Sequence, residues 1–421
     1  MSPHYTGTLA CIRCRDTYPE DVAFGGCPRC AAAGVPSNLA PAYQVTQGAL
    51  PVSPSEPGIF RYRQLLPLSA QDEPVSLGEG STPLLPLKHL GSQLGLDNLW
   101  LKDESRNPTW SYKDRLAAGA VTKARAVGAD TVVVATTGNH GAAVAAYAAA
   151  AGMRCVALTL HSVPETMRTL MQVYGARVIA YEHPTDRWRV MAAAVKERGW
   201  VPMSGFMNPP IGSNPFGVDG YKSIAFEVVE QLGRAPDVVL VPVAYGDGLA
   251  GIARGFADLR ALGVIRRVPR LVAAECFGPY RQALQSGADV TGSVPVRASK
   301  AFSIATPVGT YQGINALRDS GGSAVAIQDD DDIMGMQLRL AAAEGLYLEA
   351  ASVIALLAAR DLVRDNWLRP DELVVSIGTS TGLKDVGSTT ERLPAVAAAE
   401  PTLAALDEAL AQASETVPGR S

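Results

Sequence analysis

The sequence has few aromatic residues and almost no surplus charge. Phe, Trp and Tyr together make up 6% of its 421 residues, and the formal net charge at pH 7 is −4. Without a large positive charge, the chain has no general electrostatic attraction to nucleic acids or anionic membranes. We therefore expect neither nucleic acid nor a membrane as a partner. The 47% of hydrophobic residues is ordinary for a globular protein.

Long hydrophobic runs are also missing. The apolar stretch at residues 142–153 is shorter than the roughly 20 residues that a membrane-spanning helix needs. The opening residues, MSPHYTGTLACIRC, lack the basic start and the apolar centre of a secretion signal. These two absences predict a cytoplasmic protein.

Short β-rich runs alternate with longer helical runs from residue 131 onward. Strands are predicted at 131–136, 154–160, 176–182, 237–243, 270–276 and 372–378. Helices are predicted at 140–151, 164–175, 185–199, 220–233 and 248–263. This alternation favours an α/β fold with parallel sheets covered by helices on both faces. Ligands bind at the carboxyl ends of strands in such folds, so the strand-to-helix loops are the places to search.

Four of the six cysteines fall within the first 30 residues. They form two pairs with Cys-x-x-Cys spacing: Cys11, Cys14, Cys27 and Cys30. Two such pairs suit a tetrahedral zinc ion, and four sulfur ligands leave no open position for catalysis. The alternatives are two disulfides, which conflict with a cytoplasmic setting, or a redox pair, which needs no second copy. We predict a structural zinc site, and we expect Cys155 and Cys276 to be reduced core residues.

A lysine-containing segment, NPTWSYKDR at 107–115, follows a predicted strand. It resembles the NPTGSFKDR pattern of threonine synthases, and LGEGSTPL at 77–84 resembles that family's GEGxTPL segment. The resemblance implies a pyridoxal-phosphate (PLP) enzyme in which Lys113 binds the cofactor as a Schiff base and moves protons. That chemistry requires an amine that can lose its proton. Without the resemblance, a lysine between polar neighbours is more often a solvated surface residue.

The loop TTGNHG at 136–141 resembles the family's STGN or SSGN loop. The resemblance implies that Asn139 contacts the ring oxygen of the cofactor and that neighbouring hydroxyls bind the substrate carboxylate. The helix that follows presents free N–H groups, which suit an anion. The plainer alternative is a strand-to-helix turn with an asparagine cap. On the resemblance we predict four substrate-binding residues: Ser111, Thr136, Thr137 and His140.

Two further loops complete the predicted cofactor site. The first resembles the family's phosphate loop (GGGGL or GNxGN) and comprises Ala244, Tyr245, Gly246, Asp247, Gly248 and Leu249. Backbone N–H groups and a helix N-terminus suit a phosphate, so the carboxylate of Asp247 has to point away or be paired. The second, SIGTSTGLKD at 376–385, resembles the family's LTGHGLKD ending, which implies that Thr379 lies against the pyridine nitrogen. A neutral hydroxyl there does not enforce a protonated ring, which suits α-proton abstraction followed by elimination.

The resemblance covers nearly the whole chain, from Cys11 to about Asp385. It implies PLP fold type II: an α/β protein of two αβα domains with mostly parallel sheets, plus an N-terminal zinc-ribbon-like unit. We place that unit at 1–45 and a linker with the start of the PLP-binding large domain at 46–125. A smaller αβα domain is expected at 126–225, the rest of the large domain at 226–390, and a C-terminal tail at 391–421.

One segment departs from the family. Threonine synthases that act on O-phosphohomoserine hold its phosphate with Asn, Ser and Arg, and here the matching positions read Ile211, Gly212 and Gly217. Losing the arginine removes the strongest type of phosphate contact. Trp110 also replaces a glycine near the reactive lysine. We therefore expect a substrate other than O-phosphohomoserine, with its side chain near Trp110, Tyr245 and Phe216.

The sequence thus predicts a PLP-dependent lyase or synthase that acts on an L-amino acid by β- or γ-elimination or replacement. The alternatives within this class are a true threonine synthase and an amino-acid ammonia-lyase or dehydratase. A non-catalytic regulator is disfavoured because Lys113, Asn139 and Thr379 are all present. A nucleic-acid-binding zinc ribbon is disfavoured because acidic residues balance the three arginines of residues 1–30. We expect a small-molecule amino-acid substrate and a homodimer.

Overall fold

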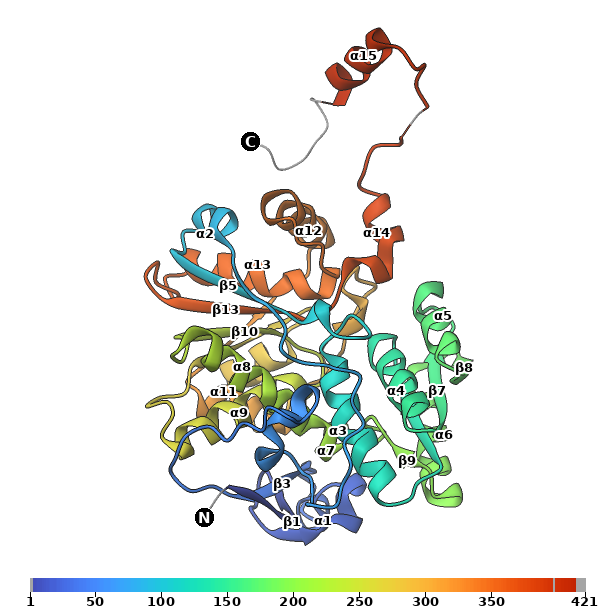
Figure 1. The fold of residues 1–421 in the computed structure, drawn as a ribbon, viewed down its shortest axis with the longest axis vertical. Helices are drawn as coiled ribbons and strands as arrows, with labels where there is room; N and C mark the ends of the chain where they lie inside the picture. The colour runs from blue at the N-terminus through green and yellow to red at the C-terminus, as the bar shows by residue number, and fades with distance from the viewer. Residues whose placement is uncertain (1–2, 397, 414–421) are drawn as a thin grey trace.

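The computed structural model describes residues 3–396 and 398–413, which form three β-sheets with their helices (Figure 1). The blue N-terminal unit in Figure 1 is a small antiparallel sheet in the order β2-β1-β3 with two short helical turns. Its elements are β1 (His4–Cys11), β2 (Thr17–Pro19), η1 (Glu20–Gly25), α1 (Pro28–Ala32) and β3 (Leu39–Gln44).

The large sheet has six strands in the order β12-β11-β10-β13-β5-β4. All neighbours are parallel except β4 and β5. In chain order the strands are β4 (Leu84–Pro86), β5 (Asn98–Asp103), β10 (Val238–Pro242), β11 (Arg270–Glu275), β12 (Ser323–Ala326) and β13 (Leu373–Gly378).

Helices cover both faces of the large sheet. The Val239 and Val241 side chains of β10 pack with α8, α9 and α11, whereas Val238 and Leu240 pack with α12 and α13. This burial on both faces explains the continuous apolar run of β10. The helices are η2 (Gly58–Leu65), α2 (Lys88–Leu94), η3 (Glu104–Arg106), α3 (Lys113–Ala126), α7 (Pro215–Val218), η4 (Asp219–Tyr221), α8 (Lys222–Leu232), α9 (Asp247–Leu262), α10 (Pro279–Ser286), η5 (Phe302–Ile304), α11 (Tyr311–Asp319), α12 (Asp330–Glu344), α13 (Ala350–Arg364), η6 (Gly382–Asp385) and α14 (Val386–Thr390).

The small sheet, green in Figure 1, has four parallel strands in the order β8-β7-β6-β9. Val132 and Val134 of its central strand β6 belong to the main core, whereas Val133 packs with Met191 of α6. The elements are β6 (Thr131–Ala135), α4 (Asn139–Ala150), β7 (Arg154–Leu160), α5 (Glu165–Val173), β8 (Arg177–Tyr181), α6 (Pro184–Arg198) and β9 (Val201–Pro202).

The structure confirms the predicted α/β architecture with mostly parallel sheets. Each of the six predicted strands is present, with ends within one residue of the prediction, and the five predicted helices end within two residues. The short edge strand β12 and the helices α10 to α13 were not predicted. The helix α15 (Leu403–Ala413) extends away from the rest of the chain (Figure 1). Among the described residues, no helix combines the length and apolar character that crossing a bilayer requires.

Candidate active site

The candidate cofactor lysine is the first residue of a helix. After β5 and η3, the chain reaches Lys113 at the start of α3. The N–H of Tyr112 donates to the carbonyl oxygen of Thr379 at 2.9 Å, which ties this turn to the loop after β13. The Lys113 Nζ atom lies 4.9 Å from the centre of the Tyr112 ring and 5.8 Å from that of Tyr221. Across the described residues, no carboxylate forms an ion pair with this amine.

Trp110 precedes this lysine in an unusual backbone conformation. Its φ angle is 60°, in the left-handed region that glycine adopts without steric cost. This explains why a glycine can stand at the corresponding position of the family pattern. The Trp110 carbonyl oxygen accepts hydrogen bonds from Ser380 Oγ at 3.1 Å and from the N–H of Thr381 at 3.3 Å. The indole, with 43% of the residue exposed, is available to contact a substrate.

Asn139 lies at the start of α4 and is held by three side chains. Its Nδ2 donates to Glu349 Oε2 at 2.7 Å, and its Oδ1 accepts from Lys384 Nζ at 2.7 Å and from Ser380 Oγ at 3.2 Å. Burial lowers the pKa of Lys384 to about 8, while the nearby carboxylate of Glu349 opposes that shift. The amide of Asn139 is therefore fixed in one orientation by residues of the large-sheet region.

Sequence reasoning did not identify Glu349 and Lys384. They are 210 and 245 residues from Asn139 along the chain. Lys384 falls in the segment 376–385 that resembles the family, and Glu349 lies within the wider resemblance that extends to about Asp385, which was the available signal. Their shared contact with Asn139 depends on tertiary structure, which segment-by-segment comparison does not give.

The hydroxyl of Thr379 lies in the same region. Thr379 Oγ1 is 2.8 Å from Ser352 Oγ, at the first turn of α13. Ser111, two residues before the lysine, pairs with Ser380 through an isolated antiparallel bridge. The Ser111 Oγ atom is buried and has no hydrogen-bond partner in the described part of the chain. It is a free polar group beside Lys113.

The loop after β6 brings His140 close to the lysine. Burial, with a smaller contribution from the positive charge of Lys113, holds the pKa of His140 well below its usual value. The imidazole is therefore neutral at pH 7. Thr136 Oγ1 accepts from the N–H groups of Gly138 at 3.0 Å and Gly141 at 2.9 Å, so this hydroxyl builds the turn into α4. Thr137 is half-buried in the same loop.

The candidate phosphate loop follows β10 and leads into α9. Gly246 has a φ of 87°, and a Cβ atom there would lie 2.4 Å from Tyr280 Oη, so only glycine fits. Asp247 Oδ1 accepts from the N–H of Ser213 at 2.8 Å and from Gln312 Nε2 at 2.6 Å, so this carboxylate is paired. A Cβ atom on Gly248 would lie 2.8 Å from the Tyr112 ring, so the loop adjoins the lysine segment.

Arg187 was not identified from the sequence. Only 6% of this α6 residue is exposed, and its Nη1 donates to the carbonyl oxygen of Thr136 at 2.8 Å. Burial lowers its pKa, and the neighbouring Tyr245 opposes that shift. The adjacent Trp188 ring lies 6.0 Å from the Tyr245 ring, which places this part of α6 beside the phosphate loop. None of the described carboxylates pairs with Arg187.

The expectation that Phe216 contacts the substrate is wrong. Phe216, which is 2% exposed, packs in the apolar core of the N-terminal unit with Leu9 and Leu39. Gly217 is equally enclosed, because a Cβ atom there would lie 2.9 Å from the carbonyl oxygen of Leu116. The short helix α7 turns this segment toward the N-terminal unit and α3.

The four cysteines of the N-terminal unit lie together. Their sulfur atoms are all within 4.8 Å of one another, with Cys11 and Cys30 at 3.6 Å and Cys14 and Cys27 at 3.6 Å. Four sulfurs about 2.3 Å from a tetrahedral zinc ion would be about 3.8 Å apart. The N–H of Cys14 also donates to Cys11 Sγ, and that of Cys30 to Cys27 Sγ. The donor set fits zinc.

Comparison with known proteins points to the same family as the sequence motifs. Residues 75–380 match the family of pyridoxal-phosphate dependent enzymes. The chain is 34% identical to threonine synthase of Methanocaldococcus jannaschii over 78% of this chain and 81% of that protein. It is 31% identical to threonine synthase of Methanosarcina acetivorans over 90% of this chain and 92% of that protein.

Solved structures share the fold at lower identity. Diaminopropionate ammonia lyase from Escherichia coli superposes with a TM-score of 0.63 at 19% identity, covering 75% of this chain and 88% of that one. The processed form of threonine deaminase isoform 2 from Solanum lycopersicum also gives a TM-score of 0.63 at 19% identity, covering 83% and 93%. The architecture is thus that of a fold type II PLP enzyme. The chain belongs to the family of pyridoxal-phosphate dependent enzymes, and it is a lyase or synthase of the threonine synthase type.

Proposed function

We propose that the chain performs elimination or replacement at the side chain of an L-amino acid, with PLP bound to Lys113. The observation that carries this proposal is the convergence of the lysine turn, Asn139, Thr379 and the glycine loop of α9 in one place. PLP, when bound, stabilises negative charge at the α-carbon of the amino acid. The protein residues position the cofactor and move the protons.

Lys113 is the proposed acid and base. Its amine lies near two tyrosine rings and a neutral His140, and none of the described carboxylates forms an ion pair with it. In this role Nζ takes the α-proton of the substrate and later returns a proton to the reacting carbon. The orphaned Ser111 Oγ and His140 Nε2 are free to bind substrate, which supports their proposed roles.

The proposed phosphate site is the N-terminus of α9. Gly246 and Gly248 let backbone N–H groups approach an anion closely, and the first turn of a helix offers unpaired donors. The paired carboxylate of Asp247 is turned to Ser213 and Gln312. At the other end of the cofactor, Asn139 is proposed to contact the ring oxygen and Thr379 the ring nitrogen.

Reduction with borohydride tests this assignment, because it attaches the cofactor covalently to the lysine that holds it. Purified protein should show a visible absorption band that borohydride abolishes, leaving the cofactor attached to Lys113. Lys113→Ala should lose both the band and turnover, whereas Lys196→Ala, an exposed lysine on α6, should lose neither. A labelled peptide from another part of the chain would refute the role of Lys113.

We further propose that the substrate is not O-phosphohomoserine. The buried positions Ile211 and Gly217 offer no charge to a phosphate, and burying a dianion without partners costs several kcal/mol. About 1.4 kcal/mol of lost transition-state binding reduces the rate tenfold. A substrate screen that follows phosphate, ammonia and keto acid would identify the leaving group. Efficient formation of threonine and phosphate would contradict the proposal.

True threonine synthase activity is the second candidate, and Arg187 favours it. This buried guanidinium lies between Thr136 and Tyr245 without an acidic partner among the described residues, so it could supply the missing charge. In that case Arg187→Met should reduce kcat/KM for O-phosphohomoserine at least a hundredfold. The same variant should change α-proton exchange on alanine by less than about threefold, because that substrate carries no side-chain anion.

The proposed metal is a structural zinc ion held by Cys11, Cys14, Cys27 and Cys30. The sulfur separations and the N–H donors to Cys11 and Cys27 support this role. The zinc would hold the N-terminal unit together and takes no part in the reaction.

A further inference from the structure

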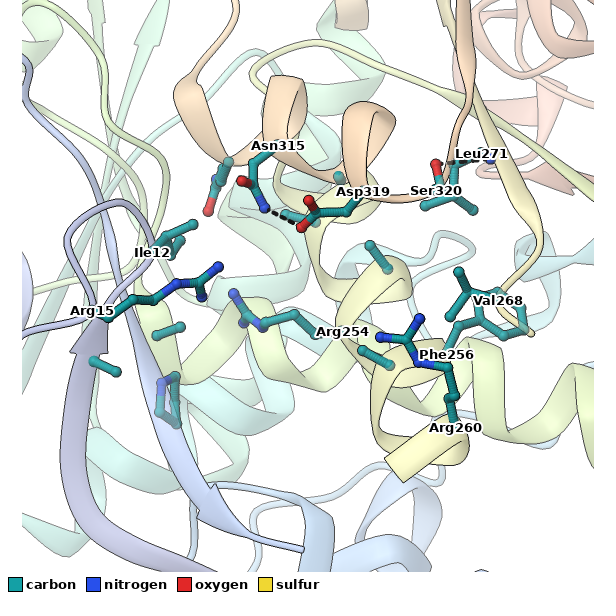
Figure 2. A pocket seen from close by; sticks show the side chains of 18 of the residues that line it. Ile12, Arg15, Arg254, Phe256, Arg260, Val268, Leu271, Asn315, Asp319 and Ser320 are labelled. Carbon is teal, nitrogen blue, oxygen red and sulfur yellow. Dashed lines mark hydrogen bonds between the residues drawn. The ribbon is translucent and has the colours of Figure 1, made fainter. Parts of the chain in front are cut away.

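A cavity of about 550 Å³ lies between the N-terminal unit and the helices of the large sheet (Figure 2). Its walls come from β1, β3, α9, β11 and α11 and from the turn after β1. This size is typical of small-molecule sites. Of the described residues that line it, none belongs to the candidate cofactor or substrate site.

The cavity carries an excess of positive charge. Three arginines line it, Arg15, Arg254 and Arg260, against the single carboxylate of Asp319. Arg15 and Arg260 are exposed to solvent, and their side chains have no hydrogen bond or ion pair with the described residues. Arg254 forms an ion pair with Asp219, yet its Nε is buried and has no partner. An anion in the cavity would give a charged partner to the two exposed guanidinium groups and an acceptor to Arg254 Nε.

Two of these arginines also converge. Figure 2 shows Arg15 from the N-terminal unit and Arg254 from α9 extending into the cavity from opposite sides. The φ angle of Arg15 is 67°, a conformation that is uncommon for a residue other than glycine. Arg254 is paired with Asp219, whereas Arg15 has no carboxylate partner among the described residues, so an anion between the two guanidinium groups would supply one. Planar guanidinium groups match phosphate oxygens in paired hydrogen bonds.

The remaining walls suit an uncharged ring. Apolar side chains cover much of the cavity, among them Ala10, Pro41, Ala253, Val268, Pro269 and Leu271. On the α11 side, Asn315 Nδ2 donates to Asp319 Oδ2 at 2.7 Å, and both side chains face the cavity in Figure 2. This combination of cationic, apolar and hydrogen-bonding groups matches a phosphate monoester on a ring that carries polar substituents.

A shared helix and one hydrogen bond connect the cavity to the candidate phosphate loop. Helix α9 lines the cavity with Arg254 and starts at Asp247, in that loop. Gln312 of α11 also lines the cavity, and its Nε2 donates to Asp247 Oδ1 at 2.6 Å. The Oε1 atom of Gln312 is buried and has no partner in the described chain. A ligand that moves α11 therefore acts directly on the side chain that positions Asp247.

We propose that this cavity is an effector site for a nucleoside monophosphate or a ligand of the same chemistry, coupled to PLP binding through Gln312. The coupling rests on the proposed PLP phosphate loop, whereas the effector site itself does not depend on that loop. Coupling of this kind is reciprocal, so the effector changes the affinity for PLP by the factor by which PLP changes the affinity for the effector.

Calorimetry on the full-length, PLP-loaded protein tests the binding site. Adenosine 5′-monophosphate should bind saturably, adenosine should bind at least tenfold more weakly, and inorganic phosphate should compete. Arg15→Gln and Arg260→Gln, on separate elements, should each weaken binding at least tenfold. Arg364→Gln, which changes an exposed arginine on α13, should leave it unchanged. Absence of saturable binding, or binding that both cavity variants leave intact, would overturn the site.

The coupling has its own measurement. The dissociation constant of PLP should change at least fivefold when the monophosphate is saturating, and Gln312→Leu should abolish that change. If the Gln312→Leu variant still binds the monophosphate, and its PLP dissociation constant changes by the same factor as that of the wild type, the proposed transmission through Gln312 is wrong. If PLP does not attach to Lys113, the proposed function fails, and the calorimetric result still decides the effector site.

Discussion

The amide of Asn139 and the carboxylate of Glu349 lie 2.7 Å apart, although 210 residues separate them in the sequence. Asn139 starts the first helix of the small-sheet region, and Glu349 precedes α13 of the large-sheet region. The hydrogen bond therefore joins the two halves of the molecule beside the proposed cofactor. It fixes the orientation of the amide that is proposed to contact the ring oxygen.

This pair is expected to act as a unit in cofactor binding. Asn139→Ala and Glu349→Ala should each weaken PLP binding, and the double variant should lose less than the sum of the two. Coupling between contacting residues is about 0.5–3 kcal/mol. PLP dissociation constants of the wild type, the two single variants and the double variant give this coupling energy directly. Additive losses would show that Glu349 does not position Asn139.

The buried lysine beside Asn139 predicts a pH dependence. Burial lowers the pKa of Lys384 from its ordinary 10.5 to about 8. Below pH 8 the ammonium donates to Asn139 Oδ1 with its full charge, and above pH 8 that charge is lost. We expect kcat/KM to decline on the alkaline side with an apparent pKa near 8. Lys384→Met should remove that decline, while Lys88→Met, which replaces an exposed lysine of α2, should retain it.

Lys384 also predicts a pH dependence of stability, and its direction is opposite to that of kcat/KM. The unfolded chain binds more protons at Lys384 than the folded chain between pH 8 and 10.5. Its contribution to the free energy of unfolding therefore rises with pH in that window. Urea unfolding of the wild type and of Lys384→Met, compared at pH 7.5 and 10, isolates this contribution. A difference between the two proteins that does not change with pH would contradict it.

Arg115 is expected to stabilise the fold. It is completely buried, with Nε 2.6 Å from Glu104 Oε2 and Nη1 2.7 Å from Glu227 Oε1. Arg115→Met would leave two buried carboxylates short of a partner, which costs about 3–5 kcal/mol. Arg125→Met, on the same helix, breaks a partly exposed pair with Glu73 and should cost about 0–1 kcal/mol. Denaturant midpoints compare the two variants, and equal losses would refute the prediction.

Metal analysis tests the cysteine cluster. Freshly purified, reduced protein should contain zinc, and Cys27→Ser should lower the zinc content. Cys155→Ser, which replaces a buried cysteine outside the cluster, should not. Because metal binding is coupled to local folding, Cys27→Ser should also speed amide exchange in residues 3–45 while the PLP band persists. Protein of full activity without zinc in the cluster would refute a structural metal.

The central strands of the large sheet were predictable because they are buried on both faces. Val238 to Val241 are all fully enclosed, so the strand reads as one apolar run. The missed strand β12 is short, lies at the edge, and has mixed burial, which leaves no such run. The homodimer and the cytoplasmic location stay predictions.

Only those site residues that lie within a short recognisable sequence motif could be predicted. The segments around Lys113, Asn139 and Thr379 each carry a recognisable pattern. The partners Glu349 and Arg187 acquire their roles from tertiary contacts, and a resemblance read segment by segment does not show which residues they touch. Phe216 was misplaced for the same reason, because the direction of its ring is set by packing against the N-terminal unit.

The position of β13 in the large sheet has a consequence for synthesis of the chain. This strand is the last of the sheet in the sequence, yet it lies between β10 and β5 and pairs with both. Until it leaves the ribosome, the antiparallel pair β4-β5 has no strand pairing with the β10-β11-β12 group within the described strands. Pairing between such distant segments is slow. The nascent chain therefore exposes the edges of two unfinished half-sheets until residues 373–378 have left the ribosome, and only then can the loop after β13 contact Tyr112 and Asn139.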